Sequence, residues 1–220
     1  MLDYQHVLTS GIACTAPLSK IVCVGRNYAD HAKELNNPIP KRPLLFIKPA
    51  TAAVPMQEPL QLPQGFGECH HELEMAVLIG QRLTRATAKQ AQAAVAGLGL
   101  AFDLTLRDLQ TELKEKGQPW ERAKAFDGSC PLSPFIDSTG VDWQNLAVQL
   151  YRNEHLQQDG NTAQMLFSVV DLLVEISASF SLLPGDVVLT GTPAGVGPLH
   201  TGDSLRACLG DVLEVETTVL

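Results

Sequence analysis

The sequence predicts a β-rich α+β fold. Short apolar and β-branched runs, bounded by Gly, Pro and Asn, recur along the 220 residues and are typical of strands. Helical patterns are fewer and do not alternate with the strands, which disfavours a doubly wound parallel sheet. Gly97-Leu98-Gly99 lacks the third glycine of a dinucleotide-binding fingerprint. Because no repeat or low-complexity tract divides the chain, we expect one domain over residues 1–220, with a short N-terminal extension at residues 1–19.

Strands are expected wherever the apolar runs are short and end at turn residues. Residues Gln149–Gln157 resemble a hairpin that turns at Asn153-Glu154. In chain order the expected strands are Lys20–Val24, Leu44–Lys48, Leu73–Ile79, Leu98–Leu104, Leu146–Arg152, Asp186–Thr190, Ser204–Cys208 and Val212–Thr217.

Helices are expected at Tyr28–Leu35, Thr87–Val95, Leu106–Lys116 and Ala163–Phe180. The first follows Asn27, a residue type that often caps helix N-termini, and Asp30 stands three residues later, as in a capping box. The third is amphipathic and stops at a glycine. The fourth carries a long apolar stripe, which is typical of a helix packed on a core.

Composition excludes several classes of function. Acidic residues outnumber basic ones, 24 to 16, and the net charge of −8 argues against a nucleic-acid partner. No apolar stretch reaches the roughly 18 residues that a membrane span needs. The five cysteines have no Cys-x-x-Cys spacing, which indicates free, mostly buried thiols. Residues 1–10 lack the pattern of a secretory leader, so we expect a cytoplasmic protein.

Two acidic residues begin an otherwise apolar strand. In a strand, alternate side chains share a face, so Glu72 and Glu74 point the same way, toward the face that also carries Ala76 and Leu78. Two neighbouring carboxylates on such a strand repel each other and lose hydration. A positive group must offset this, or the pair must lie at a solvated strand end.

Asp103 stands in a similar apolar run, and three such carboxylates suit a hard divalent cation such as Mg²⁺ or Mn²⁺. Three protein oxygens would leave about three positions for water or substrate, as in a catalytic site. Two alternatives stay open from pattern alone: Glu72 and Glu74 as charges on an edge strand, and Asp103 as a turn cap. His70 and His71 point to opposite faces, and we expect neither to contact the metal.

Several separated motifs resemble those of the fumarylacetoacetate hydrolase family. The similarity runs from about Lys20 to the end of the chain, and it is strongest to the compact branch of acylpyruvate hydrolases and oxaloacetate decarboxylases or tautomerases. The motifs, in the family's order, are His70-His71-Glu72-Leu73-Glu74, Asp103-Leu-Thr-Leu-Arg107-Asp108, Trp120–Asp127, Asp159-Gly160-Asn161-Thr162 ahead of Met165, and Leu183–Gly197.

This resemblance implies that Glu72, Glu74 and Asp103 hold Mg²⁺ or Mn²⁺. It also implies a mixed β-roll with flanking helices, a homodimer, and small 2-oxo or enol carboxylates as substrates. A 2-oxo carboxylate can chelate the cation, which then stabilises the enolate formed on C–C cleavage or proton loss.

Local cations must attract such a substrate, because the net charge does not. The resemblance implies that Lys124 faces the metal and holds the substrate carbonyl or enolate, although a surface lysine would be ordinary here. Arg107 and Gln110 share a helix face and have site counterparts in relatives, but Arg107 could equally pair with Asp103. Thr192 enters a turn with Gly191 and Gly195 and can bind a carboxylate, or the turn can bind nothing.

His31 and Glu34 share a helix face and could form a dyad in which the carboxylate orients a general base for water. In the acylpyruvase-like branch a matching pair lies on a lid. Asn36-Asn37 and three prolines, Pro38, Pro40 and Pro43, follow and suit a mobile flap. The alternative is an ordinary solvated helix face.

The leading hypothesis is therefore a Mg²⁺-dependent enzyme that hydrolyses, decarboxylates or tautomerises acylpyruvates and oxaloacetate. A second is a 2-hydroxyhepta-2,4-diene-1,7-dioate isomerase or decarboxylase of aromatic catabolism. A third, from a different class, is a metal-binding protein without catalysis, such as a small-molecule sensor.

Overall fold

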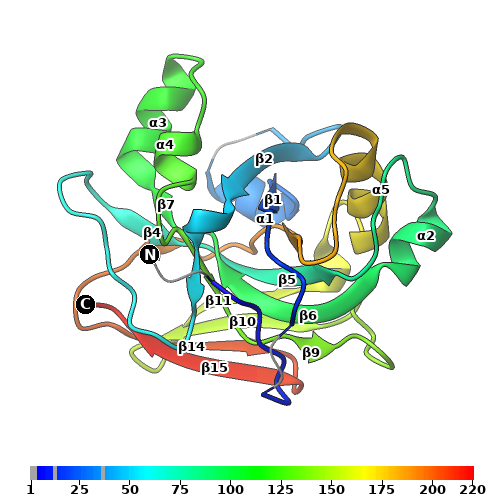
Figure 1. Cartoon of the computed structure of the whole chain (residues 1–220). Helices are drawn as coiled ribbons and strands as arrows, with labels where there is room; N and C mark the ends of the chain where they lie inside the picture. Colours follow the sequence, from blue (N-terminus) through cyan, green and yellow to red (C-terminus); the bar gives the residue numbers. More distant parts are fainter. Residues whose placement is uncertain (1–3, 12–13, 36–37) are drawn as a thin grey trace.

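The computed structural model describes residues 4–11, 14–35 and 38–220 and confirms the predicted β-rich α+β fold (Figure 1). The strands are β1 (Lys20–Gly25), β2 (Leu44–Pro49), β3 (Ala53–Pro55), β4 (Cys69–His71), β5 (Leu73–Ile79), β6 (Val95–Phe102), β7 (Thr105–Leu106), β8 (Cys130–Leu132), β9 (Ile136–Asp137), β10 (Ala147–Arg152), β11 (His155–Asn161), β12 (Val187–Leu189), β13 (Gly197–Pro198), β14 (Ser204–Leu209) and β15 (Leu213–Thr218).

Helices are short and lie around these strands. They are α1 (Ala29–Glu34), α2 (Ala88–Ala93), α3 (Arg107–Glu115), α4 (Glu121–Lys124) and α5 (Val169–Ser179), with 3₁₀ turns η1 (Ala50–Ala52) and η2 (Thr162–Gln164). Helices α3 and α4 project together from one side of the sheets, while α2 and α5 lie at the opposite side (Figure 1). Within the described part of the chain, no helix is long and apolar enough to cross a membrane.

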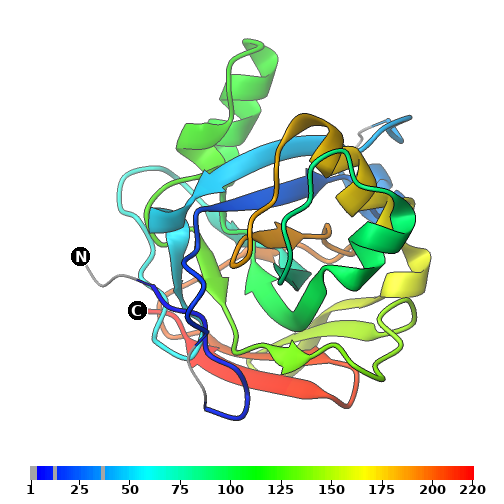
Figure 2. The ribbon, with the colours of Figure 1, turned by 45° about the vertical axis from the view of Figure 1, so that its right-hand side comes forward.

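The largest sheet is mixed and strongly curved (Figure 2). Its strand order is β2-β1-β12-β5-β6-β8-β3, with β9 added beside β6. Strand β1 pairs with β12 in parallel, and Val22 lies opposite Val188. About 160 residues of chain separate the two strands. This places β5 in the interior of the sheet, bonded to β12 on one side and to β6 on the other.

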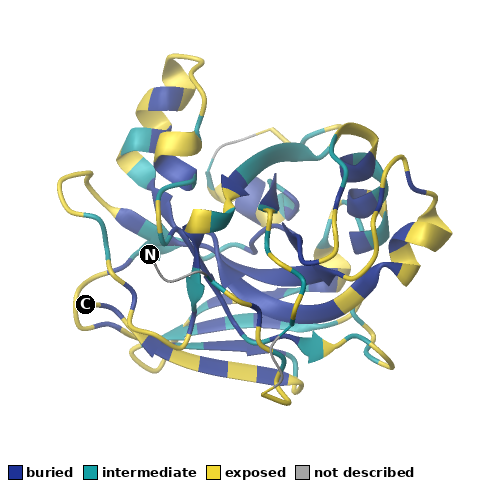
Figure 3. Ribbon diagram, viewed as in Figure 1, coloured by how far each residue is buried: buried dark blue, intermediate teal, exposed yellow. Residues whose placement is uncertain are grey.

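Both faces of β5 are buried, and they serve different cores (Figure 3). Leu73, Met75, Val77 and Ile79 enter the larger core, which a second sheet of order β11-β10-β14-β15 closes from below. Ala76 and Leu78 enter a smaller core on the concave side. The predicted alternation is thus confirmed, and the face that carries Glu72 and Glu74 is the face of the smaller core.

Most expected elements are present, and the differences have physical reasons. Asn153 and Glu154 adopt the positive φ values of a tight hairpin turn, 50° and 66°. The helix expected over Ala163–Phe180 is shorter, because Ser168 caps a new N-terminus and accepts a hydrogen bond from Asp171 N. The five cysteines are free, as expected.

The capping role expected of Asn27 is wrong. Helix α1 begins after Tyr28 without a side-chain cap. The Asn27 amide instead reaches two distant segments: it donates to the carbonyls of Phe167 and Thr190 and accepts from Phe167 N. Asn27 therefore ties the start of α1 to the loop after β12, which helps to place α1 over the site described below.

Candidate metal centre and active site

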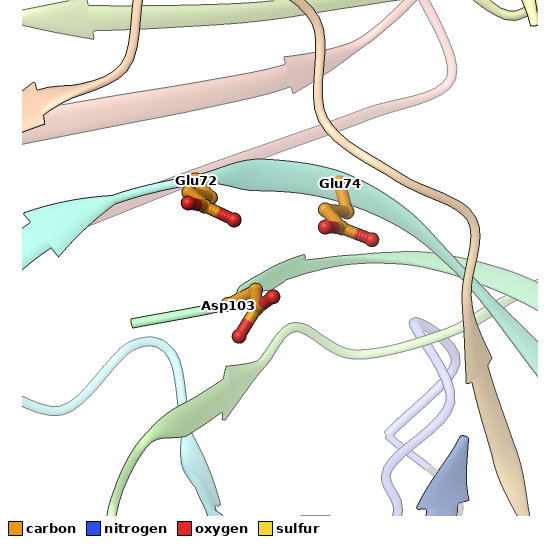
Figure 4. Close-up of side chains that lie close together, drawn as sticks. All are labelled: Glu72, Glu74 and Asp103. Carbon is orange, nitrogen blue, oxygen red and sulfur yellow. The ribbon is translucent and has the colours of Figure 1, made fainter. Parts of the chain in front are cut away.

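Three carboxylates converge at one end of the smaller core. Glu72 lies between β4 and β5, Glu74 is the second residue of β5, and Asp103 directly follows β6, next to them in the sheet (Figure 4). One oxygen atom from each lies within 4.8 Å of the other two. All three residues are at most 5% exposed. Because β5 is an interior strand, the reading of Glu72 and Glu74 as edge-strand charges is wrong.

Two buried lysines neutralise this cluster. The Lys124 ammonium, at the end of α4, donates to Glu72 at 2.8 Å, to Asp103 at 2.7 Å and to the Thr105 hydroxyl at 2.7 Å. From β2, the Lys48 ammonium lies 2.9 Å from Asp103 Oδ1. Burial alone would lower the pKa of Lys124, but the two carboxylates raise it above its ordinary value. Lys124 is therefore a buried, charged group and no surface lysine.

Arg107 completes the charge balance at the outer side of Glu72. Its guanidinium donates to Glu72 Oε1 at 2.5 Å and to Gln110 Oε1 at 2.7 Å. Burial alone would raise the pKa of Glu72, but Lys124 and Arg107 hold it well below its usual range. The alternative in which Arg107 pairs with Asp103 is wrong, because Glu72 is its partner. Arg107 fixes the Gln110 oxygen, and Gln110 lines the pocket described below.

Glu74 has a different environment from Glu72. It accepts a 2.6 Å hydrogen bond from Gly191 N, a glycine whose φ of 99° and contact with Asn27 exclude a Cβ. Burial, reinforced by the charges of Asp103 and Glu72, raises the pKa of Glu74 well above its usual range. Asp103 Oδ1 also has no hydrogen-bond donor in ideal geometry within the described residues.

These observations fit a bound cation. An all-oxygen donor set, a Glu74 carboxyl whose pKa is raised by burial and by its acidic neighbours, and an Asp103 oxygen held only by an ion pair with Lys48 are what a hard divalent cation would satisfy. The cluster therefore has the chemistry needed to hold a divalent metal.

His31 and Glu34 form the expected dyad. His31 Nδ1 lies 3.1 Å from Glu34 Oε2, and His31 is only 5% exposed, which excludes an ordinary solvated helix face. Because a carboxylate only accepts, Nδ1 is the protonated nitrogen in this contact, and in the neutral imidazole the lone pair then lies on Nε2. The other Glu34 oxygen accepts from Gly195 N at 2.9 Å. The dyad is thus attached to the glycine-rich loop after β12.

Thr192 lies in the same loop and is 2% exposed. Its hydroxyl donates to Leu73 O at 2.8 Å and accepts from Gln158 Nε2 at 2.7 Å. The hydroxyl hydrogen is therefore committed to the backbone of β5. Thr192 therefore fixes this loop to β5, the strand that carries Glu74. This role is independent of any ligand that the turn binds.

One pocket brings these groups together, with about 460 Å³ of space including its opening to solvent. Every candidate site residue except Glu34 lines it, and Glu34 contacts the lining residue His31. Leu35, Leu44, Phe46 and Trp120 supply apolar walls, while Arg26 and Lys114 add two further cations.

The adjacent histidines lie outside the carboxylate cluster, as expected. His71 Nδ1 donates to Gln158 Oε1 at 3.0 Å, and burial lowers the pKa of His71 to about 4. His70 contacts Glu68 at 3.0 Å, on the exposed side. The part of the flap at Asn36-Asn37 lies outside the described residues, so that expectation is not tested.

Sequence reasoning missed Lys48, Thr105 and Gln158. Lys48 is fully buried in β2 and bonds to Ser129 as well as to the Lys124 carbonyl. A signal was present, because a lysine within the apolar run Leu44–Pro49 demands a buried acceptor or a solvated strand edge. Thr105 and Gln158 have no comparable signal.

A curled mixed sheet with an acidic cluster and a histidine–glutamate pair in one pocket defines a class of metal-dependent enzymes. Residues 20–220 match the fumarylacetoacetate (FAA) hydrolase C-terminal family. The chain belongs to this family and is an enzyme.

Relatives place it within the compact branch. The chain is 52% identical to oxaloacetate tautomerase YcgM of Escherichia coli, over 92% of this chain and 93% of the relative. It also matches the crystal structure of fumarylpyruvate hydrolase from Pseudomonas aeruginosa in complex with Mn²⁺ and pyruvate, with 34% identity, coverage of 100% and 97%, and a TM-score of 0.93. A 2-hydroxyhepta-2,4-diene-1,7-dioate isomerase from Mycobacterium marinum is 35% identical, with coverage of 96% and 79% and a TM-score of 0.81.

Proposed function

We propose that this enzyme uses Mg²⁺, or Mn²⁺ in its place, to process small 2-oxo carboxylates. Its main reaction is the enol–keto interconversion of oxaloacetate, and the same site hydrolyses or decarboxylates related acids. The observation that carries this proposal is the single pocket that joins three buried carboxylates, Lys124 and the His31–Glu34 dyad. The 52% identity to an oxaloacetate tautomerase supports the choice of substrate.

Glu72, Glu74 and Asp103 would hold the cation in this proposal. When bound, it would act as a Lewis acid on the 2-oxo carboxylate. The Mn²⁺ and pyruvate in the Pseudomonas aeruginosa fumarylpyruvate hydrolase support this role.

Lys124 and Gln110 act on the substrate oxygen. All three N–H groups of Lys124 are used by Glu72, Asp103 and Thr105, so the ammonium is fixed in direction before a substrate arrives. Exchange of one of these bonds for an enolate oxygen would place a full positive charge where negative charge develops. The Gln110 NH₂ group supplies a second, neutral donor, and Arg107 and the backbone N–H of Thr192 position the substrate carboxylate.

His31 moves the proton. With Nδ1–H held by Glu34, the Nε2 lone pair can accept a proton from substrate C3 or from water and return it. Enol–keto exchange needs only this relay and a stabilised enolate. Hydrolysis of an acylpyruvate needs in addition a correctly placed water molecule, so it depends more strongly on the dyad.

Metal dependence tests the carboxylate assignment. We expect Glu72→Gln and Asp103→Asn to abolish turnover and Mg²⁺ binding together, because each removes a charged oxygen donor from the cluster. Calorimetric titration with Mg²⁺ and an oxaloacetate enol–keto assay, before and after chelation, measure both. Glu68→Gln is the control, since Glu68 lies 60% exposed and pairs with His70 outside the cluster. Full turnover in either cluster variant would refute the assignment.

A second experiment tests the dyad. We expect His31→Ala to reduce acetylpyruvate hydrolysis by about 10²–10⁴-fold and oxaloacetate enol–keto exchange much less. Steady-state rates for the two substrates on the same preparation give the ratio. Equal losses in both reactions would remove His31 from the role of water-activating base.

The second candidate function is isomerisation of longer diacids such as 2-hydroxyhepta-2,4-diene-1,7-dioate. The similarity to the Mycobacterium marinum isomerase favours this candidate. A turnover panel of oxaloacetate, acetylpyruvate, fumarylpyruvate and a hydroxyheptadienedioate separates the candidates by pocket size. The sensor alternative is disfavoured, because Lys124 and His31 both line the pocket beside the carboxylates. The homodimer stays a prediction, for which light scattering after size exclusion is the measurement.

A further inference from the structure

Two cations line the pocket without belonging to the carboxylate cluster. Arg26 follows β1 and Lys114 lies in the last turn of α3, so they approach from different elements. Lys124 and Arg107, in contrast, are bonded to Glu72 and neutralise it. Arg26 and Lys114 therefore add positive charge to a pocket in which Glu72 and Asp103 are already paired with other cations.

Arg26 is held in place by its backbone. Its φ of 61° is a left-handed conformation that non-glycine residues rarely adopt outside turns, and strained backbone of this kind clusters at active sites and ligand clamps. Across the described ranges 4–11, 14–35 and 38–220, no acidic side chain forms an ion pair with its guanidinium. Partial burial lowers the pKa of Arg26, so the group is also partly desolvated.

Lys114 lies close enough to Arg26 and Arg107 to be repelled by them. Burial, followed by the charges of Arg26 and Arg107, lowers the pKa of Lys114, and the nearby charge of Glu72 only partly opposes this. Like charges held together at a pocket wall are relieved when an anion binds between them. The wall thus favours an anionic group on the ligand.

We infer that Arg26 and Lys114 bind the second carboxylate of the substrate, at the end away from the metal, and so select dicarboxylic over monocarboxylic 2-oxo acids. This inference rests on the proposed function. The 2-oxo carboxylate occupies the metal end, and an arginine fork is well suited to the distal carboxylate.

Oxaloacetate and acetylpyruvate form a matched pair for the test. Both carry a 2-oxo carboxylate and a C4 carbonyl carbon, which bears O⁻ in oxaloacetate and CH₃ in acetylpyruvate. The two ligands are almost equal in size and differ by one negative charge at the distal end. Both also enolise, so enol–keto exchange can be measured for both with the same readout.

The variants are Arg26→Asn and Lys114→Gln. Asparagine tolerates a left-handed backbone, so the first removes the guanidinium with little strain. We expect each variant to raise KM for oxaloacetate at least about tenfold, since hydrogen bonds to charged groups contribute about 1.5–3 kcal/mol. KM for acetylpyruvate and the inhibition constant of oxalate, which reaches only the metal end, should stay within about twofold. Lys116→Gln, at the end of α3 and paired with Glu112, is the matched control for net charge.

The outcomes are distinct. A rise in KM for oxaloacetate without a rise in KM for acetylpyruvate supports the inference. Equal loss for both substrates, no loss for either, or the same loss in Lys116→Gln overturns it. If the unaltered enzyme with Mg²⁺ processes neither substrate, the proposed function has failed. If it processes both and the variants do not discriminate, only the role of Arg26 and Lys114 has failed.

Discussion

Buried charge at the site is balanced residue by residue. Lys48 is the clearest case, since its ammonium is fully buried and lies beside Asp103, Ser129 and the Lys124 carbonyl. Each of these groups is itself excluded from water. A buried ion pair contributes little net stability, but removal of one partner is costly because the other stays charged and unpaired.

We therefore expect Lys48→Met to lower the free energy of unfolding by about 3 kcal/mol. Urea denaturation followed by circular dichroism measures this, with Lys33→Met as the control. Lys33 makes its 3.0 Å pair with Asp30 at the surface, where both side chains are more than 70% exposed, so its loss should be close to neutral. Equal stabilities of the two variants would contradict the role of Lys48.

Two buried histidines make stability depend on pH. Burial lowers the pKa of His6, whose Nε2 donates to Gly185 O at 2.7 Å, and it lowers the pKa of His71 to about 4. The unfolded chain binds a proton at each histidine below its ordinary pKa of about 6.5, whereas the native protein does not. Their contribution is therefore complete above about pH 6.5 and is lost as the pH falls below it, for His71 down to about pH 4.

We expect the free energy of unfolding to fall by up to about 1.4 kcal/mol per pH unit for each histidine in this range. His6→Gln keeps a donor near the Nε2 position for Gly185 but does not titrate, so its stability should depend less steeply on pH. Urea midpoints between pH 7 and pH 5, without added metal, give the slopes. Parallel slopes in the variant and the unaltered protein would exclude His6 as a source.

At the scale of elements, the site depends on how α1 meets the loop after β12. Asn27 connects the start of α1 to this loop, and Glu34 connects its end through Gly195 N. Gly195 has a φ of 98°, and a Cβ there would lie 2.0 Å from Gln157 O. The close approach of the loop to β11 thus requires glycine, and it sets where the dyad stands.

We expect Gly195→Ala to reduce acetylpyruvate hydrolysis at least about tenfold, because the shifted loop would misplace Glu34 and His31. Enol–keto exchange should fall less. Gly202→Ala is the matched control: its φ is also left-handed, at 92°, but nothing lies within 4 Å of the added Cβ. That control should cost about 1 kcal/mol of stability and leave both rates unchanged. Equal loss of both reactions in Gly195→Ala would indicate a general disruption of the site.

At the scale of the whole molecule, local patterns predicted the strands but not how they assemble. Alternation along Leu73–Ile79 correctly placed Glu72 and Glu74 on one face. Nothing local indicates that β1 pairs with β12, and this pairing brings α1, and with it His31, to the carboxylates. The contact between Lys48 and Asp103 likewise depends on tertiary packing and not on any local pattern in the sequence.

Candidate site residues could also be predicted where the relation between them is local, and not where it depends on distant segments. His31 and Glu34 could be paired from their spacing on one helix. The resemblance to known motifs supplied Lys124, which spacing alone could not join to Asp103. Asn27 was assigned a local role from its residue type, whereas the fold gives it a long-range one.

The single ammonium that joins Glu72 to Asp103 also restricts how sequences of this kind can diverge. Replacement of Lys124 alone would leave Glu72 with only Arg107 and Asp103 with only Lys48, and replacement of either acid alone would leave the lysine with a single carboxylate. We therefore expect Glu72, Asp103 and Lys124 to change together among related sequences. A homologue that lacks Glu72, Asp103 or Lys124 should also lack the residue that pairs with it. We expect such a homologue to have lost the metal-dependent reaction.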